Sequence, residues 1–485
     1  MTANMKLVCI HGHFYQPPRE NPWTGTVDRQ WSARPFHDWN ERVTAECYEP
    51  NAAARILEGG QKIRRILNNY SMMSFNFGPT LLLWMEREHP DVYRAILKGD
   101  DESRRRFSGH GSAIAQAYNH MIMPLANSRD KRTQVVWGVG DFRFRFERDP
   151  EGMWLPETAV DIETLEIMAG EGLRFTILAP HQALRIRETG GKWVDVSGGR
   201  IDTTVPYRCP LPSGRNIAIF FYNGGIAHAI AFGSLLQDGA FFARKMIEGS
   251  GPVGEEALLS HTAVDGETFG HHHRFGDMAL AYCLETIDKS PDAALTIYGE
   301  FLEKFPPKRE VEIAENTSWS CSHGVERWRS DCGCTAGKHT GWHQKWRAPL
   351  REALDGLRKI IDNIFETEAA AYFPDPWEAR DSYADVLLKG GADGMDERAR
   401  ALLEMERNAM LMYTSCGWFF NDISRIETIQ ILRYAARAVE LAEGLSGLPI
   451  EGPFLEALEK VPGNTTEMKN ARMGYEKAIS VRRGN

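Results

Sequence analysis

The sequence lacks the long hydrophobic and basic runs that would place it at a membrane or on a nucleic acid. No stretch of its 485 residues reaches the roughly 18 apolar positions of a membrane span. The first residues, MTANMKLVCIHGHFYQPP, lack the apolar core and cleavage site of a signal peptide. Acidic residues outnumber basic ones by 66 to 57, for a formal net charge of -9, and no basic stretch would attract phosphates. We therefore expect a cytoplasmic protein that acts on a neutral or polar substrate, with no membrane and no nucleic acid among its partners.

Cysteine is sparse as well. The eight cysteines are scattered, apart from Cys321, Cys332 and Cys334, which fits reduced thiols better than a disulfide framework. Hydrophobic residues make up 42% and charged residues 25% of the chain, close to the globular average, so we expect a large core and little long disorder. The length exceeds the usual span of one core and predicts two domains.

Short β-rich runs alternate with longer helical patterns from residue 5 to about 310. This order is typical of an α/β domain built from βαβ units. Each run is followed at once by polar or Gly/Pro-rich residues. In a parallel barrel those strand ends share one rim, where active sites are built. The predicted strands are residues 6–10, 72–75, 152–155, 175–178, 216–221 and 257–264.

Beyond residue 344 the hydrophobic pattern becomes helical. Apolar side chains recur on one helix face between residues 350 and 364, and similar stretches run over 397–412 and from near Ile426. The residues of the first face are Leu350, Leu354, Leu357, Ile361 and Ile364. We expect a catalytic (β/α) barrel at 1–310, a Cys/His-rich loop segment lining or capping the cleft at 311–343, and a helical domain at 344–485.

Two of the predicted strands deliver carboxylates to the rim. One leads to Glu157, with Trp154 three residues before it, where an indole could form a sugar platform and partly desolvate the acid. The other leads to Asp265 and Glu267 around a glycine turn, followed closely by His271. Each acid taken alone could be a solvated loop residue. A glycosidase needs one carboxylate that stays ionised and one that is held protonated, and Glu157 and Asp265 are the natural pair.

Histidines add polar groups to the same region. His11 and His13 end the first predicted strand, and we expect their imidazoles to face opposite sides, so that shared metal binding would require the backbone to turn. Hydrogen bonds to sugar hydroxyls place weaker constraints on the positions of the two imidazoles. Tyr118-Asn-His120 is a weaker signal that also suits a carbohydrate cleft.

A Cys/His-rich segment follows the α/β region. It could bind zinc, but its spacing is not the paired CxxC of common zinc modules, so we favour reduced structural thiols and expect neither a metal nor a cofactor. Its members are Cys321, His323, Cys332, Cys334, His339 and His343.

Together these segments resemble glycoside hydrolase family 57, a family of α-amylases, 4-α-glucanotransferases and branching enzymes, over roughly the whole chain. Its W-x-x-E motif is similar to Trp154 and Glu157, and its D-x-E-x-F-G motif to Asp265-Gly-Glu-Thr-Phe-Gly270. The family's H-x-H-Q-P motif resembles His11-Gly-His13 followed by Gln16-Pro17. Its second motif resembles Tyr118-Asn-His120. Its S-S-D-W motif resembles Ser415-Cys-Gly-Trp418, with Gly417 in place of Asp.

The resemblance implies an incomplete (β/α) barrel of about seven strands, a following helical domain and retention of anomeric configuration. It implies Glu157 as nucleophile and Asp265 as general acid/base on an α-glucan or maltooligosaccharide. The substrate-binding residues it implies are His11, His13, His120, Trp154, Glu267, His271 and Trp418.

Two rival interpretations stay open. Barrels of related build serve metal-dependent carbohydrate deacetylases, in which zinc activates water, and Asp265 with His11 or His13 could supply ligands. A catalytically idle glucan-binding homologue would keep the cleft without the reaction. The sequence leaves the linkage, the balance of hydrolysis and transfer, and the oligomeric state undetermined.

Overall fold

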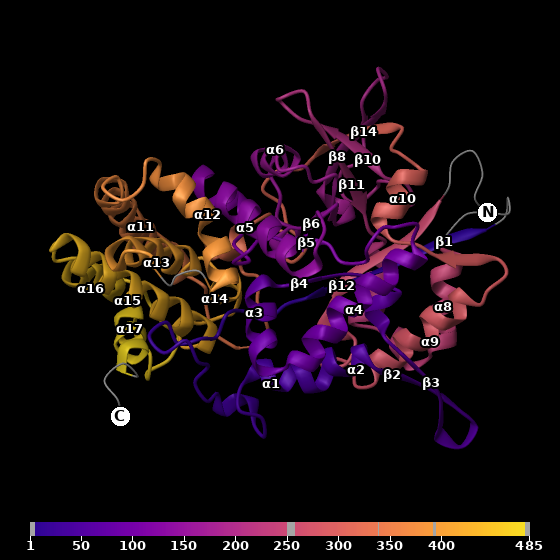
Figure 1. Cartoon of the computed structure of the whole chain (residues 1–485), viewed down its shortest axis with the longest axis horizontal. Coiled ribbons are helices and arrows are strands. Elements are labelled where there is room, and N and C mark those ends of the chain that lie inside the picture. The colour runs from indigo at the N-terminus through magenta and orange to yellow at the C-terminus, as the bar shows by residue number, and fades with distance from the viewer. Residues whose placement is uncertain (1–4, 250–257, 338, 391–393, 481–485) are drawn as a thin grey trace. The chain divides into compact units, whose positions relative to one another are not determined.

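The structure is a computed structural model of the chain and describes residues 5–249, 258–337, 339–390 and 394–480. Two compact units, each drawn from several segments of the chain, make up the fold (Figure 1). The barrel unit comprises Met1–Gln16, Arg29–Gln116 and Phe142–Glu315, and the helical unit comprises Pro17–Asp28, Ala117–Asp141 and Asn316–Asn485. The linear domain bounds expected at residues 310 and 343 remain a prediction.

Short parallel strands form the centre of the barrel unit. Within the described residues seven of them succeed one another in the spatial order β12-β1-β4-β5-β6-β7-β11, through parallel ladders or, at β4/β5 and β6/β7, single bridges. No ladder joins β11 to β12 in this part of the chain, so the barrel is incomplete, as predicted. The strands are β1 (Lys6–Phe14), β4 (Ser74–Phe77), β5 (Ala115–Gln116), β6 (Met153–Trp154), β7 (Phe175–Leu178), β11 (Asn216–Phe221) and β12 (Leu259–Asp265).

The sequence of β1 explains its central place. From Leu7 to Phe14 every residue is buried, the near-continuous burial expected of a parallel strand covered on both faces. It pairs with β12, with β4 and, at its start, with β13 (Ala293–Leu295). All six predicted strands are present, although β1 runs on to Phe14 and Ala257 lies outside the described residues. The two-residue β5 was not predicted, because it is too short to show a periodicity.

Helices and a second sheet complete the barrel unit. β7 and β11 continue into a mixed extension that the sequence did not predict, antiparallel except where β10 pairs with β14. Its strands are β10 (Tyr207–Pro210), β14 (Arg309–Ile313), β8 (Ala183–Glu188) and β9 (Val194–Asp195). The main helices of this unit are α3 (Pro79–Glu88), α4 (Pro90–Arg106), α6 (Ile162–Gly170), α7 (Gly224–Ala231), α8 (Gly239–Glu248), α9 (Gly276–Asp288) and α10 (Tyr298–Lys304). The unit also contains a hairpin of β2 (Ala54–Glu58) and β3 (Lys62–Leu67) and the short helices α1 (Trp39–Val43) and α2 (Glu49–Ala52). Of these, β2 and α2 contact α9.

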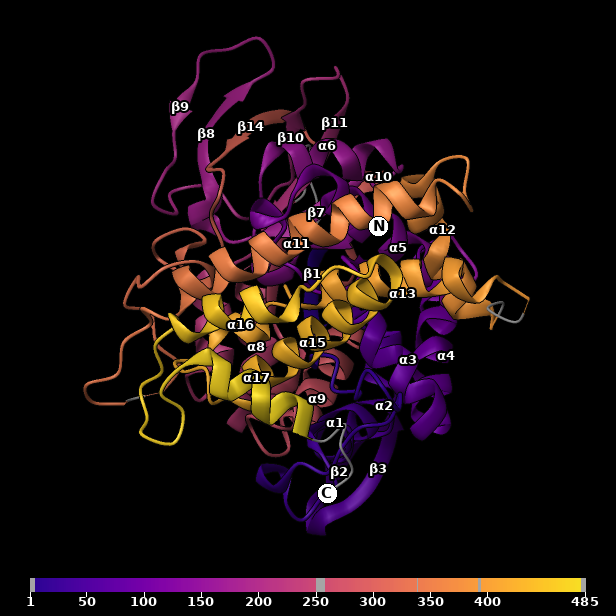
Figure 2. The ribbon, with the colours of Figure 1, turned by 90° about the vertical axis from the view of Figure 1, so that its left-hand side faces the viewer.

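The helical unit is a bundle in which long helices lie side by side (Figure 2). The apolar face predicted between Leu350 and Ile364 is buried on α11, and the helices predicted at 397–412 and from Ile426 are α13 and α15. α5 (Ser128–Phe146) passes from this unit into the barrel unit. The remaining helices are α11 (Arg347–Ala369), α12 (Pro376–Lys389), α13 (Glu397–Leu411), α14 (Cys416–Phe419), α15 (Ile426–Ser446), α16 (Glu451–Glu459) and α17 (Ala471–Ser480).

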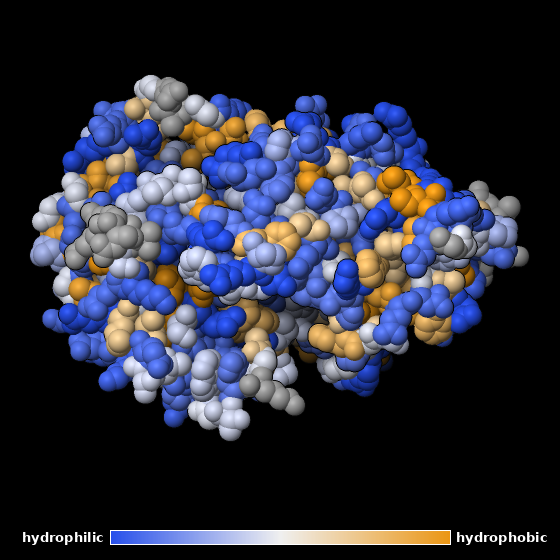
Figure 3. Space-filling model, turned by 90° about the horizontal axis from the view of Figure 1, so that it is seen from below, coloured by the Kyte–Doolittle hydropathy of each residue, from blue (hydrophilic) through white to orange (hydrophobic). Residues whose placement is uncertain are grey.

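One face of the molecule, drawn in Figure 3, carries mostly polar side chains. On the face drawn in Figure 3, hydrophobic residues form separate small patches among hydrophilic ones. Among the described helices, none combines the length and apolar character needed to cross a membrane.

Candidate active site

Parallel pairing brings three strand ends of the barrel unit into register. His13 on β1 lies opposite Asp265 on β12 and opposite Asn76 on β4. Because the carboxyl ends of parallel strands share a rim, the polar residues that follow each apolar run converge there. The first and last strands of the predicted set therefore meet at Asp265.

Asp265 combines exposure with desolvation. Its residue surface is open to solvent, yet the carboxyl is crowded by protein atoms. This desolvation, followed by the negative charges of Glu267 and Glu157, raises the pKa of Asp265 well above its ordinary value. A carboxyl that a ligand can reach and that stays protonated has the two properties of a general acid.

Gly266 allows β12 to present two carboxylates within three residues. A Cβ at this position would lie 2.2 Å from Cδ1 of Phe14, so the turn after Asp265 accepts only glycine without displacing that buried ring. Glu267 then points into the protein, where its Oε1 accepts hydrogen bonds from the Tyr15 amide at 2.9 Å and the Tyr48 hydroxyl at 2.6 Å. Burial raises the pKa of Glu267 to about 7.

Glu157 lies in a strained turn directly after β6. Its φ is 56° and that of Thr158 is 52°, a left-handed conformation that side chains other than glycine rarely adopt. Such strain persists only where the surroundings hold it, and it clusters at functional sites. The Glu157 side chain is half-buried, and its charge reaches the Asp265 carboxyl.

The buried amide of Gln182 holds this strained turn. Thr158 Oγ1 donates to Gln182 Oε1 at 2.8 Å, and Gln182 Nε2 donates to the Thr158 carbonyl at 2.8 Å. The amide of Ala179 also donates to Gln182 Oε1 at 2.8 Å. The Gln182 side chain thus holds Thr158, the residue next to Glu157, by both the backbone carbonyl and the hydroxyl of Thr158.

The two histidines of β1 share one face of the strand. The prediction that they face opposite sides was wrong, because residues two apart in a strand point the same way. Both rings stack on Trp154, each with a centroid distance of 5.0 Å. Burial lowers the pKa of His11 and of His13 to about 3, so both imidazoles are neutral at physiological pH.

Neighbouring side chains occupy the imidazole nitrogens. His11 Nε2 donates to Asn76 Oδ1 at 3.1 Å, and its Nδ1 shares a hydrogen bond of 2.9 Å with Ser74 Oγ. His13 Nδ1 accepts from Asn76 Nδ2 at 2.9 Å, and the same amide nitrogen donates to Gln116 on β5 at 2.8 Å. These bonds tie β1, β4 and β5 into one buried polar network below the rim.

Several residues expected to bind substrate are buried in this structure. His11 and Trp154 have no exposed surface, and Glu267 is 5% exposed. The Trp154 ring packs under the two imidazoles instead of offering a face to solvent, so it does not form the expected sugar platform here. His271 is held by a hydrogen bond to Glu46.

His120 and Trp418 belong to the helical unit. His120 is buried with a φ of 55°, and its Nδ1 shares a hydrogen bond of 2.6 Å with Ser415 Oγ. Trp418 is buried and donates its indole N–H to the Met412 carbonyl at 3.2 Å. Gly417 fits here because a Cβ would lie 2.5 Å from Ile431 Cγ2, which leaves no room for the Asp of the family motif.

The supporting residues of the site were missed to different degrees. Asn76 directly follows a predicted strand and carried a usable signal. Gln182 follows the predicted strand 175–178 and carried the same signal, although its bond to Thr158, 24 positions away, could not be predicted. Gln116 carried none, since it lies on a two-residue strand.

The geometry disfavours a catalytic metal at the rim. Within the described residues, the only His, Cys, Asp and Glu side chains that gather in metal-binding geometry are Cys321, His323, Cys332 and Cys334 of the helical unit. His11 has both ring nitrogens engaged by Ser74 and Asn76. Among the described residues, Asp265 and the rim histidines are therefore not part of a group of three or more potential metal ligands, and the structure lends no support to a metal-dependent deacetylase.

Solved structures share this fold. An exo-type maltose-forming amylase from Pyrococcus sp. ST04 has a TM-score of 0.70 at 14% identity, with 98% of this chain and 88% of that chain covered. A GH57-type branching enzyme from Pyrococcus horikoshii has a TM-score of 0.56 at 16% identity, covering 98% and 94%. An α-amylase from Thermotoga maritima has a TM-score of 0.56 at 13% identity, covering 97% and 99%. These similarities confirm the fold class, an incomplete (β/α) barrel with a C-terminal helical domain.

Sequence comparison adds the family. The family model of glycosyl hydrolase family 57 matches residues 13–314, and a domain of unknown function (DUF3536) matches residues 342–483. Alpha-amylase 1 of Dictyoglomus thermophilum is 22% identical over 106 residues, which are 22% of this chain and 15% of that relative. The chain belongs to glycosyl hydrolase family 57. The predicted resemblance to this family is thereby confirmed.

Proposed function

We propose that the protein cleaves or transfers α-glucan chains with retention of anomeric configuration, using Glu157 as nucleophile and Asp265 as general acid/base. The observation that carries the proposal is the electrostatic pairing of the two residues: Asp265 is exposed, and the charge of Glu157 contributes to the raised pKa of its carboxyl. Family membership and the amylase and branching-enzyme neighbours support an α-glucan as substrate.

In the first step the Glu157 carboxylate attacks the anomeric carbon of the glucose unit to be transferred. The bond from that carbon to the leaving oxygen breaks, and Asp265 gives its proton to the oxygen, so that a glycosyl ester on Glu157 and a shortened glucan result. The raised pKa keeps the proton on Asp265 until this step. The strained turn at Glu157 holds the nucleophile without a conformational search.

In the second step Asp265, now ionised, removes a proton from the acceptor as the acceptor oxygen attacks the same carbon. Attack by water gives hydrolysis, and attack by a hydroxyl of another glucan gives transfer. Two inversions at one carbon leave the configuration unchanged. A retaining enzyme of this kind is expected to hold its two carboxyl groups roughly 5 to 5.5 Å apart.

The test compares wild type with Glu157→Gln on end-labelled maltooligosaccharides, with product lengths and anomers resolved. We expect retained anomers from wild type and a loss of roughly 10⁴-fold or more in kcat for the variant, as for removal of other catalytic nucleophiles. Glu166→Gln is the matched control, because Glu166 is an acid of the same unit that pairs with Arg215 outside the site.

Each other outcome counts against the proposal in a different way. Inverted anomers would remove the double displacement. Equal activity of Glu157→Gln and wild type would remove Glu157 from the mechanism. Glucan binding without turnover in wild type would favour the idle homologue.

A further inference from the structure

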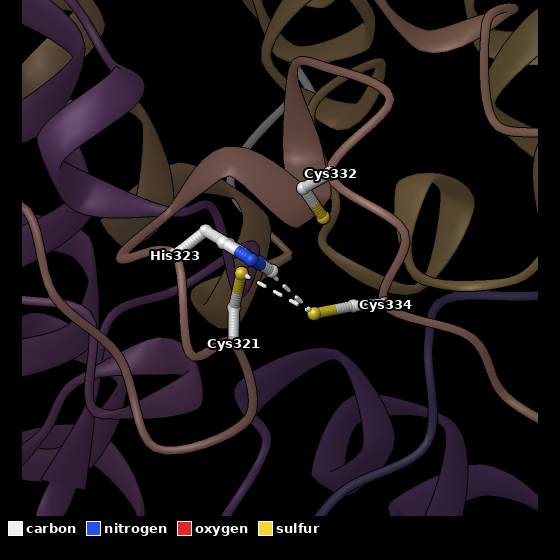
Figure 4. Close-up of side chains that lie close together, drawn as sticks. All are labelled: Cys321, His323, Cys332 and Cys334. Carbon is white, nitrogen blue, oxygen red and sulfur yellow. Dashed lines mark hydrogen bonds between the residues drawn. The ribbon is translucent and has the colours of Figure 1, made fainter.

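The strongest unexplained cluster of reactive side chains lies in the helical unit. Cys321, His323, Cys332 and Cys334 point toward one another (Figure 4), and their ligand atoms all lie within 4.8 Å of each other. His339 and His343, which share the same Cys/His-rich segment, are not members of this group. We call the four residues the Cys3His cluster.

Two distances within the Cys3His cluster match the edges of a metal tetrahedron. Cys321 Sγ and Cys334 Sγ are 3.8 Å apart, and Cys334 Sγ lies 3.5 Å from His323 Nδ1. Ligands at about 2.3 Å (sulfur) and about 2.0 Å (nitrogen) around a tetrahedral zinc lie roughly 3.8 Å apart for a sulfur pair and roughly 3.5 Å apart for sulfur and nitrogen. Both measured edges agree with this geometry.

The long connection that carries the cluster also favours a cross-link at this place. Residues 314–346 connect β14 to α11, and their described part contains one short 3₁₀ turn, Glu326–Trp328. Loops of this length without regular structure are uncommon in compact domains unless they have a function or are tied down. The four cluster residues come from both sides of that turn, so one ion would close the loop on itself.

Hydrogen bonds already hold both arms of the loop in place. Arg327 is buried and donates to the Ser320 carbonyl at 3.0 Å beside Cys321. Beyond Cys334, the Ala336 amide donates to Asn421 Oδ1 at 3.0 Å, and Asn421 Nδ2 donates back to the Ala336 carbonyl at 2.9 Å. The cluster residues therefore lie on two loop segments that hydrogen bonds hold in place.

We propose that the Cys3His cluster is a structural zinc site. Three thiolates and one imidazole are the soft donor set that zinc prefers, and four protein ligands complete the tetrahedron and leave no open position for substrate or water. The ion ties residues 321–334 into a closed loop and stabilises the adjoining segment, in which Arg327 and Arg347 donate to the Phe419 carbonyl. The role is distinct from glycosyl transfer, which needs no metal in the mechanism above.

The first experiment measures metal content of the full-length protein purified without added chelator. Elemental analysis should find one zinc per chain in wild type. Cys332→Ser and Cys334→Ser should lower zinc affinity by more than about 100-fold, since even the loss of a group that only orients a ligand costs 10–100-fold. His339→Ala is the matched control, because it removes a histidine of the same segment that stacks on Trp342 outside the cluster, and it should retain the zinc.

The second experiment covers the case in which a cysteine variant fails to fold. Wild type is stripped of metal under reducing conditions and titrated with Co²⁺ alone, and a tetrahedral thiolate site should produce intense visible bands and sulfur-to-cobalt charge transfer at one equivalent. Thiol titration should find three fewer reactive cysteines in the zinc form than in the stripped form.

Three results would overturn the proposal. These are a wild type that binds no zinc or Co²⁺ at one equivalent, zinc retained by both cysteine variants, and a Cys321–Cys334 disulfide in freshly isolated protein. None of them bears on Glu157 or Asp265, so the proposed glycosyl chemistry stands or falls separately.

Discussion

The two units bury carboxylates in opposite electrostatic surroundings. In the helical unit, Asp130 and Glu406 face Arg358 and Arg380 through four contacts of 2.8 to 2.9 Å. Burial by itself would raise the pKa of Asp130, but the two guanidinium charges outweigh it and hold that pKa below the ordinary value. The arginines thus favour the ionised form of Asp130, and the cluster acts as a structural tie between helices. At its edge, Asp362 lies 3.2 Å from Arg358, and burial raises the pKa of Asp362 to about 6.

In the barrel unit the neighbours of a desolvated carboxyl are other acids. Glu267 and Glu157 add to the desolvation of Asp265, and all these effects raise its pKa. A cluster that is not neutralised costs stability but can exchange protons near neutral pH. The comparison separates a cluster that suits a structural role from the acids for which we propose a catalytic role, although both use the same residue types.

The largest expected effect comes from removing Asp265, the proton donor that we propose. Asp265→Asn should lower kcat on maltooligosaccharides by roughly 10² to 10⁴-fold, because the amide can neither give nor take the proton. For an aryl glycoside whose phenol departs without protonation, the rate of the first step should fall much less. Burst and steady-state kinetics on both substrates check this, and an equal loss on both would reduce Asp265 to a residue that only shapes the site.

Breaking the neutralised cluster should cost stability instead. Glu406→Gln removes the carboxylate that contacts both buried guanidinium groups and leaves Asp130 and Asp362 to face them, so it should lower the free energy of unfolding by about 3 to 5 kcal/mol. Calorimetry measures the change, and kcat well below the transition should stay that of wild type. Replacing the pair together, as in Arg380→Met with Glu406→Leu, should restore much of the loss. A double variant as unstable as the single one would contradict the charge argument.

The pH dependence of this cluster has a definite sign. Because the folded-state pKa of Asp130 is depressed, its contribution to stability is present above the unfolded pKa of about 4 and is lost as the pH falls through the folded value. Acid should therefore destabilise the helical unit of wild type more than that of Asp130→Asn, which lacks this carboxylate.

Gln182 tests whether the strained turn is part of the catalytic arrangement. Gln182→Leu removes the bonds to Thr158 and should lower kcat by about 10 to 100-fold with little change in KM, because a misplacement of about 1 Å can cost 10²-fold. Thr158→Ser keeps the hydroxyl and serves as the control. If KM rises while kcat holds, Gln182 supports substrate binding and is not a positioning residue for Glu157.

The strand ends of this protein were readable because each apolar run gives way abruptly to polar residues. Asp265, Glu157 and Asn76 all follow such runs. The left-handed turn at Glu157 was not readable, since it depends on the Gln182 amide and not on local preference. The same holds for the buried state of Trp154, which results from stacking under two imidazoles of another strand.

The Cys3His cluster shows a second limit. The spacing of Cys321, His323, Cys332 and Cys334 was visible, but it matches no common zinc pattern and favoured free thiols. Their convergence depends on anchors such as Asn421, which lies 85 positions from its partner Ala336. Sequence patterns predict features that depend on local chain geometry. The convergence of these four residues depends on long-range hydrogen bonds and could not be predicted in this way.

The smallest expected effect is a shift in the pH dependence of kcat. It tests the contrast between the two units most directly. Glu267→Gln keeps an oxygen that can accept from Tyr15 and Tyr48 but removes a negative charge beside Asp265. The pKa of Asp265 should fall, so the alkaline limb of kcat should move to lower pH by about one unit, or roughly tenfold in rate at a fixed pH on that limb.

The same variant should gain stability above neutral pH. The pKa of Glu267 is raised to about 7 in the folded state, so its ionisation costs stability that is intact below the unfolded value and declines as the pH rises toward 7. Removing the charge should therefore stabilise the protein at pH 8 by up to about 3 kcal/mol, and by little at pH 5. Tyr48→Phe is the control, because it removes a hydrogen bond to Glu267 and keeps the charge. If Glu267→Gln moved neither the alkaline limb nor the stability, the acids of the barrel unit would not be coupled, and the contrast with the neutralised cluster of the helical unit would be lost.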